Sequence, residues 1–280
     1  MKSVLVRMTQ YQAQASMAEQ GVLGFVLENP QQAAQSSIHQ LAQQAFSSPS
    51  TVVRLCRKLG FEGYRDMQKS LLYEMAVRRQ ETGIQTEPIE QDTALSDIVD
   101  RVTLRNITSL ENSRRLVEEA VLRRSVELIC GSATVLLFGI GASFLVAQDA
   151  YLKFLRADKP CALSEDIHSQ YLHAKNARPE DAAIIISYSG HTEEILRCAR
   201  ELKRRGTPII AITRFDSSPL SQLADCNLHV VAMEEAFRSG AMSSRISQLN
   251  MIDILFTAYI SRNYAQSIPC LERNQLKKVK

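Results

Sequence analysis

The spacing of hydrophobic residues changes near residue 133 of this chain. Before that point apolar side chains recur at intervals of three and four, which is the spacing of one helix face. Helices are expected to end near Asn29, to cover about 37–45, 49–59 and 63–80, and to occupy an amphipathic stretch at 95–129. No segment of residues 1–80 has a convincing strand pattern. The first part of the chain is therefore predicted to be all-α.

After residue 133, short apolar runs alternate with segments of helical length. The runs lie at 134–139, 161–163, 182–187, 208–213 and 227–232, and helices are expected at 143–156, 166–176, 191–205, 217–224 and 242–262. Continuous β-branched runs separated by helices are typical of a parallel sheet covered on both faces. We therefore predict an open, flavodoxin-like α/β three-layer sandwich with a parallel sheet.

A polar segment separates the two parts. Residues 83–94 have the sequence GIQTEPIEQDTA, and their polarity and Pro88 favour a linker. The predicted organisation is a helical domain at 1–82, this linker, and an α/β domain at 95–280. A chain of 280 residues has the length expected of two domains.

The charge is distributed unevenly between these parts. The net charge of +3 argues against a wholly basic nucleic-acid coat protein. Residues 1–80 carry nine basic and five acidic side chains, whereas the remainder carries 24 basic and 25 acidic ones. The excess of positive charge therefore lies in the helical domain and points weakly to a polyanionic partner.

Cysteine usage and hydropathy favour a cytoplasmic protein. The six cysteines form no C-x-x-C pair and no Cys/His cluster with zinc spacing, so they are expected to be reduced core residues, and no metal is predicted. The N-terminus lacks the apolar run of a signal peptide. No stretch approaches 18 uninterrupted apolar residues, so no membrane span is expected.

Residues 41–60 have the layout of a helix-turn-helix. Ala42 lies where two helices would cross, Val52 and Leu55 would face the core, and Gly60 would end the second helix. Ser48 is placed to cap that helix, with Pro49 in its first turn. The residues predicted to contact DNA are Ser48, Ser50, Thr51, Arg54, Arg57 and Lys58.

The second helix of such a motif enters the major groove with its N-terminal residues closest to the bases. Hydroxyls and Arg reach bases or phosphates, and Lys mostly contacts phosphates. The alternative is a small helical domain whose basic face is only solvated. One departure from the pattern is Phe46, which stands in the turn where Gly or another small residue is common.

Two loops at predicted strand ends carry the features of an anion site. FGIGAS at 138–143 opens one helix, and SYSGHT at 187–192 opens another. Glycine lets backbone N–H groups approach a ligand, and a helix N-terminus attracts anions. A dinucleotide fingerprint would need Gly at the position of Phe144, so NAD binding is disfavoured. The alternative for each serine is simple helix capping. The predicted ligand-binding residues of these loops are Gly141, Ser143, Ser187, Tyr188, Ser189, Gly190 and Thr192.

Further polar residues are weaker candidates. Asp166, His168 and Gln170 begin one predicted helix, where His168 either contacts a sugar hydroxyl or is an ordinary surface histidine. Ser244, beside Ser243 and Arg245, either adds a hydroxyl to the same cleft or caps the last long helix. Arg214 either meets an anion or pairs with Asp216.

The two halves together resemble a known family. Residues 37–70, with STVVRLCRKLGFEGYRDMQKSL, resemble the helix-turn-helix of RpiR-type bacterial transcription regulators, and residues 133–231, with FGIGAS and DAAIIISYSGHTEEI, resemble a sugar isomerase (SIS) domain. The resemblance implies a dimeric or tetrameric regulator whose SIS domain binds a phosphosugar. It places Ser143, Ser187, Ser189 and Thr192 at phosphate-binding positions, and Tyr188 where many isomerases carry Gln. It also places Asp166 and His168 near the ligand cleft.

The leading hypothesis is a transcriptional regulator that binds an operator in double-stranded DNA and responds to a phosphorylated sugar. No cofactor is predicted, and no catalytic residue is assigned. The rival hypothesis is an aldose–ketose phosphate isomerase with an added helical domain. Isomerisation needs a base, for which Glu193, Glu194 and His168 are candidates, but their spacing shows no matched pair.

Overall fold

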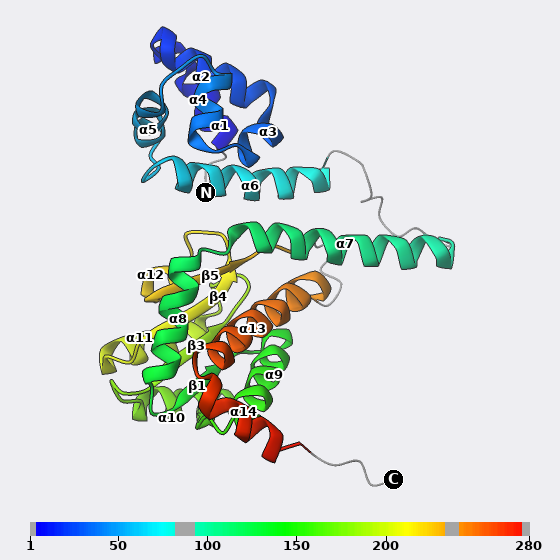
Figure 1. Cartoon of the computed structure of the whole chain (residues 1–280), viewed down its shortest axis with the longest axis vertical. Coiled ribbons are helices and arrows are strands. Elements are labelled where there is room, and N and C mark those ends of the chain that lie inside the picture. The colour runs from blue at the N-terminus through cyan, green and yellow to red at the C-terminus, as the bar shows by residue number, and fades with distance from the viewer. Residues whose placement is uncertain (1–3, 82–92, 233–240, 276–280) are drawn as a thin grey trace. The chain divides into compact units, whose positions relative to one another are not determined.

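The computed structural model describes residues 4–81, 93–232 and 241–275 (Figure 1). It divides into two compact units, Met1–Arg101 and Val102–Lys280. The linker expected at 83–94 lies almost wholly outside the described residues, and the predicted domain boundaries stay a prediction.

The described part of the first unit is helical. It contains α1 (Val4–Tyr11), a 3-10 turn (Gln12–Gln14), α2 (Met17–Glu28), α3 (Pro30–Gln35), α4 (Ile38–Gln44), α5 (Pro49–Lys58) and α6 (Tyr64–Glu81), followed by the start of α7 (Leu95–Leu116). The helices predicted at 37–45, 49–59 and 63–80 are confirmed. These helices share one hydrophobic core, in which the buried side chains include Leu23, Leu41, Leu55, Met67 and Leu71.

A buried carboxylate joins two of these helices. Glu19 in the first turn of α2 is only 1% exposed and accepts a hydrogen bond from the backbone N–H of Ser16 at 3.0 Å. Its other oxygen lies 2.8 Å from Nζ of Lys58 at the end of α5. The hydrogen bond from Lys58 is the main reason why the pKa of Glu19 lies below its usual value. The pair therefore favours the ionised form of Glu19 in the folded protein.

This depressed pKa predicts a pH-dependent stability. The contribution of ionised Glu19 to the free energy of unfolding is fully present above the pKa of Glu19 in the unfolded chain. It is lost as the pH falls through the pKa of Glu19 in the folded protein. We expect Glu19→Gln to lower the free energy of unfolding by about 1–2 kcal/mol at pH 7, since Lys58 is partly screened by water. The difference in free energy of unfolding between variant and wild type should be smaller at pH 4 than at pH 7. Urea unfolding followed by circular dichroism measures this difference. Glu28→Gln, an exposed change on the same helix, is the control, and a gap that does not depend on pH would contradict the assignment.

The second unit begins with the remainder of α7 and with α8 (Glu119–Gly131), so the amphipathic stretch at 95–129 is two helices with a break after Leu116. The following strands are β1 (Val135–Phe138), β2 (Cys161–Ala162), β3 (Ala182–Ile186), β4 (Ile209–Arg214) and β5 (Cys226–Val230). The helices are α9 (Ala142–Arg156), α10 (Ile167–Asn176), α11 (Glu193–Arg205), α12 (Pro219–Leu223), α13 (Met242–Arg262) and α14 (Tyr264–Arg273). The sequence pattern predicted each of these elements except α14.

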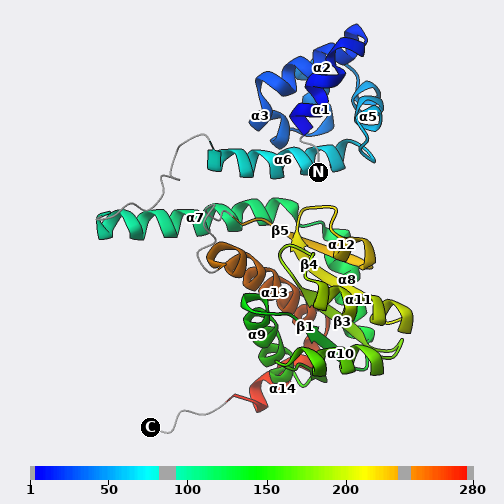
Figure 2. The ribbon, with the colours of Figure 1, turned by 180° about the vertical axis from the view of Figure 1, so that it is seen from behind.

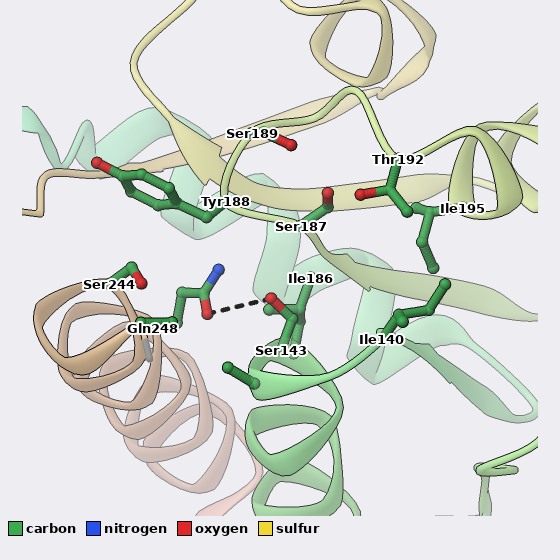
Figure 3. Close-up of a pocket in the computed structure, with 12 residues that line it drawn as sticks. Ile140, Ser143, Ile186, Ser187, Tyr188, Ser189, Thr192, Ile195, Ser244 and Gln248 are labelled. Carbon is green, nitrogen blue, oxygen red and sulfur yellow. Dashed lines mark hydrogen bonds between the residues drawn. The ribbon is translucent and has the colours of Figure 1, made fainter. Parts of the chain in front are cut away.

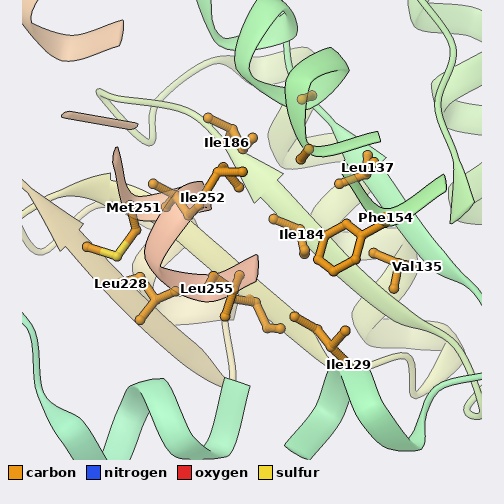
Figure 4. Close-up of a cluster of buried hydrophobic side chains, with 14 of the residues drawn as sticks. Ile129, Val135, Leu137, Phe154, Ile184, Ile186, Leu228, Met251, Ile252 and Leu255 are labelled. Atoms are coloured by element: carbon orange, nitrogen blue, oxygen red, sulfur yellow. The ribbon is translucent and has the colours of Figure 1, made fainter. Parts of the chain in front are cut away.

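The strands form one parallel sheet in the order β2-β1-β3-β4-β5. One face packs on α8, α9 and α13, where Ile129, Phe154 and Leu255 meet the strand side chain of Ile184 (Figure 4). The other face packs on α10, α11 and α12. Figures 1 and 2 show α9 and α13 together on one side of the strands and α11 on the opposite side. The predicted three-layer α/β sandwich is confirmed.

Candidate functional site

Both candidate loops leave the sheet at neighbouring strands. Strands β1 and β3 pair in parallel, with Phe138 opposite Ile185, although a strand and two helices separate them along the chain. The sheet order changes direction between these two strands, and open α/β sheets bind ligands at such a switch point, beyond the carboxyl ends of the strands. The topology therefore places the two loops side by side in the position expected of a ligand site.

A cavity of about 440 Å³ lies between these loops and α13 (Figure 3). Six of the predicted residues line it, namely Ser143, Ser187, Tyr188, Ser189, Thr192 and Ser244. Gly141 and Gly190 shape the loops without lining the cavity. The described residues of the lining include no charged side chain, and what they offer an anion are hydroxyls, an amide and backbone dipoles.

The first loop is held by close backbone packing. A side chain at Gly139 would place its Cβ 2.7 Å from the carbonyl oxygen of Ser143. The buried amide of Gln170 accepts a hydrogen bond from the N–H of Gly139 at 3.2 Å and donates one to its carbonyl at 3.0 Å. Gly141, with φ of 59°, is the residue that caps α9. Ser143 is inside that helix, so its hydroxyl is not the N-cap and points toward the cavity (Figure 3).

In the second loop the hydroxyl of Ser189 accepts a hydrogen bond from the N–H of His191 at 3.3 Å, whereas that of Thr192 makes no capping bond. Thr192 is nevertheless the N-cap residue of α11. The carbonyl of Tyr188 accepts hydrogen bonds from the N–H of Arg214 at 2.9 Å and from Oγ1 of Thr213 at 3.1 Å. These bonds tie the loop to β4. Capping therefore does not account for Thr192, and its hydroxyl lines the cavity instead.

Two residues close the cavity on the side of β5 and α13. The hydroxyl of Tyr188 accepts a hydrogen bond from the N–H of Ala232 at 3.1 Å, and this bond holds the ring in place. By the family resemblance, Tyr188 is the residue that stands where many sugar-phosphate isomerases carry Gln. Gln248, on α13, also lines the cavity and is buried. Sequence analysis missed Gln248, because a glutamine in the middle of a long helix carries no local signal of binding.

Several candidates do not reach this cavity. His168 lines a separate hollow of about 170 Å³ with Tyr171, Glu194 and Arg197. Asp166 caps α10 by accepting from the backbone N–H groups of His168 and Ser169, and hydrogen bonding from the side chain and N–H of Ser169 lowers its pKa.

Two charged candidates have partners of their own. Arg214 pairs with Asp216 at 2.7 Å, and Glu193 pairs with Arg200 at 2.7 Å. The capping and ion-pair alternatives therefore describe these residues better than contact with a ligand does.

The predicted recognition helix is α5. Ser48 accepts a hydrogen bond from the N–H of Thr51 at 3.2 Å, as a capping residue does. Ser50, Arg54 and Arg57 are exposed, and neither arginine has an ion-pair partner among the described residues. Two expectations need correction. Thr51 is not on the outer face: it is 7% exposed, and its hydroxyl contacts that of Ser48. Lys58 was expected to contact DNA phosphates, but its ammonium group forms an ion pair with the carboxylate of Glu19.

Phe46 occupies the turn before α5. Its φ of 47° lies in the left-handed region, which costs a non-glycine residue about 1 kcal/mol or more. Its side chain is 98% exposed. The turn therefore keeps the backbone geometry that usually selects glycine there, with an aromatic side chain directed into solvent.

Comparison with known proteins agrees with this geometry. Residues 2–78 match the model of the helix-turn-helix domain of the rpiR family, and residues 127–258 match the SIS domain. An uncharacterized HTH-type transcriptional regulator of Caldanaerobacter subterraneus subsp. tengcongensis is 31% identical over 97% of this chain and 95% of its own length. The chain belongs to the RpiR family of helix-turn-helix transcriptional regulators. The family resemblance found in the sequence is thus confirmed.

Further relatives extend the match along the whole chain. The regulator YbbH of Bacillus subtilis, also named as an uncharacterized HTH-type transcriptional regulator, is 30% identical over 92% of this chain and 90% of its own. The structure of Vibrio vulnificus NanR complexed with ManNAc-6P matches with a TM-score of 0.60 and 27% identity over 96% of each chain. This RpiR-family chain is therefore a DNA-binding transcriptional regulator with a SIS domain.

A more distant structure supports only the fold of the second unit. The sugar isomerase domain of an RpiR transcription factor from Sphaerobacter thermophilus matches with a TM-score of 0.57 and 18% identity, over 63% of this chain and 97% of that one. None of the described helices combines the length and the apolar composition needed to span a bilayer.

Proposed function

We propose that the cavity at the β1 and β3 strand ends binds a phosphorylated sugar and that its occupancy changes the affinity of α5 for operator DNA. The observation that carries this is the convergence of Ser143, Ser187, Ser189 and Thr192 on one cavity at two helix N-termini. Hydroxyls and helix dipoles together stabilise a phosphate without a cation. The sugar phosphate in the related NanR complex supports the same ligand class.

The effector acts only if it binds two arrangements of the protein with different affinity. We propose a homodimer or homotetramer, in which two copies of α5 face a pseudo-palindromic operator. The half-exposed Leu145, Leu152 and Leu155 on one side of α9 support a protein contact surface.

The six cysteines carry no disulfide, which supports a cytoplasmic location. The direct test of the proposed regulation is a gel shift on the DNA upstream of its own gene, with and without sugar phosphates.

An isomerase would need a base within reach of the bound sugar. The described residues that line the cavity include no carboxylate and no histidine, and His168 and Glu194 line a different hollow. We therefore propose a sensor rather than an enzyme. Incubation with ketose and aldose phosphates should show no interconversion, and turnover that depends on the cavity residues would favour the isomerase.

The double variant Ser189→Ala, Thr192→Ala is expected to weaken effector binding by at least 100-fold. Each lost hydroxyl removes a hydrogen bond to a charged phosphate, worth about 1.5–3 kcal/mol. Calorimetry with a panel of hexose 6-phosphates measures the loss. DNA binding in the absence of effector should persist, because the two residues lie in the second unit. Unchanged effector affinity would refute the phosphate site.

A further inference from the structure

One polar side chain in the cavity wall has an unused donor. Gln248 is 1% exposed, and its Oε1 accepts a hydrogen bond from the hydroxyl of Ser143 at 3.4 Å. Its Nε2 is buried and finds no hydrogen-bond partner among the described residues. The amide extends from α13 across the cavity toward the loop that follows β3 (Figure 3). Gln248 is thus bonded at one end and open at the end that faces the cavity.

Of the five buried polar side-chain atoms that lack a hydrogen-bond partner among the described residues, only Nε2 of Gln248 belongs to a residue that lines the cavity. Two other buried polar side chains of the second unit are satisfied within the protein. Ser247, also buried on α13, donates to the carbonyl of Val231 at 2.8 Å. Gln170, the other fully buried glutamine of this unit, uses both ends of its amide on Gly139. A buried donor without a partner destabilises a fold, so such groups are rare in native proteins. The open end of Gln248 therefore points to a partner that enters the cavity.

We propose that Gln248 is a ligand-binding residue whose Nε2 donates a hydrogen bond to an oxygen of the bound sugar phosphate. Its Oε1 meanwhile orients the hydroxyl of Ser143, which faces the same cavity. The proposal rests on the proposed function of the cavity. It adds a contact from α13 to those from the two loops, so that the ligand joins α9, the β3 loop and α13.

The acceptor oxygen belongs either to the phosphate or to the sugar, and two probes separate these sources. The probes are inorganic phosphate and the hexose 6-phosphate that binds wild-type protein most tightly in the panel above. Gln248→Met keeps the length of the side chain and removes both polar atoms. We expect it to weaken binding of the hexose 6-phosphate by about 10–100-fold, because a site built around a hydrogen bond discriminates strongly when that bond is lost. An equal loss for inorganic phosphate assigns the bond to the phosphate, and a loss confined to the hexose 6-phosphate assigns it to the sugar.

Gln248→Glu tests which end of the amide meets the ligand. The carboxylate has the same shape, but it lacks the donor and repels a phosphate. Binding should therefore fall further than in Gln248→Met. Binding equal to or tighter than that of wild type would show that the ligand donates to Gln248, and it would overturn the proposal.

The ligand-free protein gives a readout that a purely structural role would change. Gln248→Met removes an unpaired buried donor, so its Tm without ligand should stay within about 2 °C of wild type or rise. Gln170→Met, the matched control, should lower Tm because both of its hydrogen bonds hold Gly139. A fall in Tm for Gln248→Met as large as that for Gln170→Met would overturn the proposal, as would unchanged affinity for both probes. Wild-type protein that binds neither probe would contradict the proposed function and this inference with it.

Discussion

Replacing Gly190 with alanine is expected to abolish effector binding and to lower the free energy of unfolding by about 3 kcal/mol. Gly190 has φ of 65°, a conformation that costs a residue with a Cβ about 1 kcal/mol or more. The new Cβ would also lie 2.2 Å from Oγ of Ser218 and 2.7 Å from its Cβ. Ser218 is fully buried, and its hydroxyl caps α12 by accepting from the N–H of Ser221. It therefore cannot move aside cheaply, and overpacking of this kind costs a further 1–3 kcal/mol or so.

The same clash would displace the hydroxyls on either side of Gly190, which is why effector binding should be lost together with stability. Urea unfolding and calorimetry measure the two effects. Gly131→Ala is the matched control, since a Cβ there meets nothing within 4 Å and Gly131 has no positive φ. That variant should unfold within about 0.5 kcal/mol of wild type. If Gly190→Ala binds effector and unfolds like Gly131→Ala, the close packing of Gly190 on Ser218 does not set the geometry of the binding loop.

The sequence predicted the α/β unit well because its central strands β3 and β4 are almost continuous apolar runs, although β5 alternates buried and partly buried residues. Residues 182–186 and 209–213 are buried along their whole length in the sheet, so their burial and their sequence pattern coincide. Helix α14 escaped prediction because Pro269 lies inside it, and a proline usually argues against a helix. Helix α2 begins at Met17, before its apolar run, because Ser16 and Glu19 form a capping box.

The site was predictable where it depends on neighbouring strands and not where it depends on distant packing. Ser143 and Ser187 follow strands β1 and β3, and parallel strands bring such loops together. Gln248 contacts Ser143 across 105 positions of sequence, which no local pattern encodes. The pairing of Lys58 with Glu19 is likewise set by how α2 packs on α5. Thr51 lies three positions after the capping residue Ser48. Its hydroxyl contacts that of Ser48 and the residue is buried, so it does not face solvent.

Arg54→Ala is expected to weaken operator binding by about 5–150-fold for each copy of α5 while leaving effector binding unchanged. Arg54 is exposed in the middle of α5 and has no ion-pair partner among the described residues, so its guanidinium is available to DNA. Val52 and Leu55, beside it in sequence, are buried, which fixes the face of α5 on which Arg54 lies. An arginine contact to a base edge is worth about 1–3 kcal/mol. Gel shifts at a fixed salt concentration, with specific and non-specific DNA, measure the loss.

Two further variants decide what that loss means. Arg123→Ala removes the same charge from the exposed surface of α8, so a general electrostatic effect would appear in both variants, whereas a contact in the groove appears only in Arg54→Ala. The salt dependence separates the two modes of binding to DNA. Loss of a base contact relaxes sequence preference, while loss of a phosphate contact weakens all sequences equally and lowers the salt slope by about one. Retained operator affinity would remove Arg54 from the interface. Loss of operator binding and effector binding together would instead indicate a protein that no longer folds, because Arg54 and the cavity lie in different units.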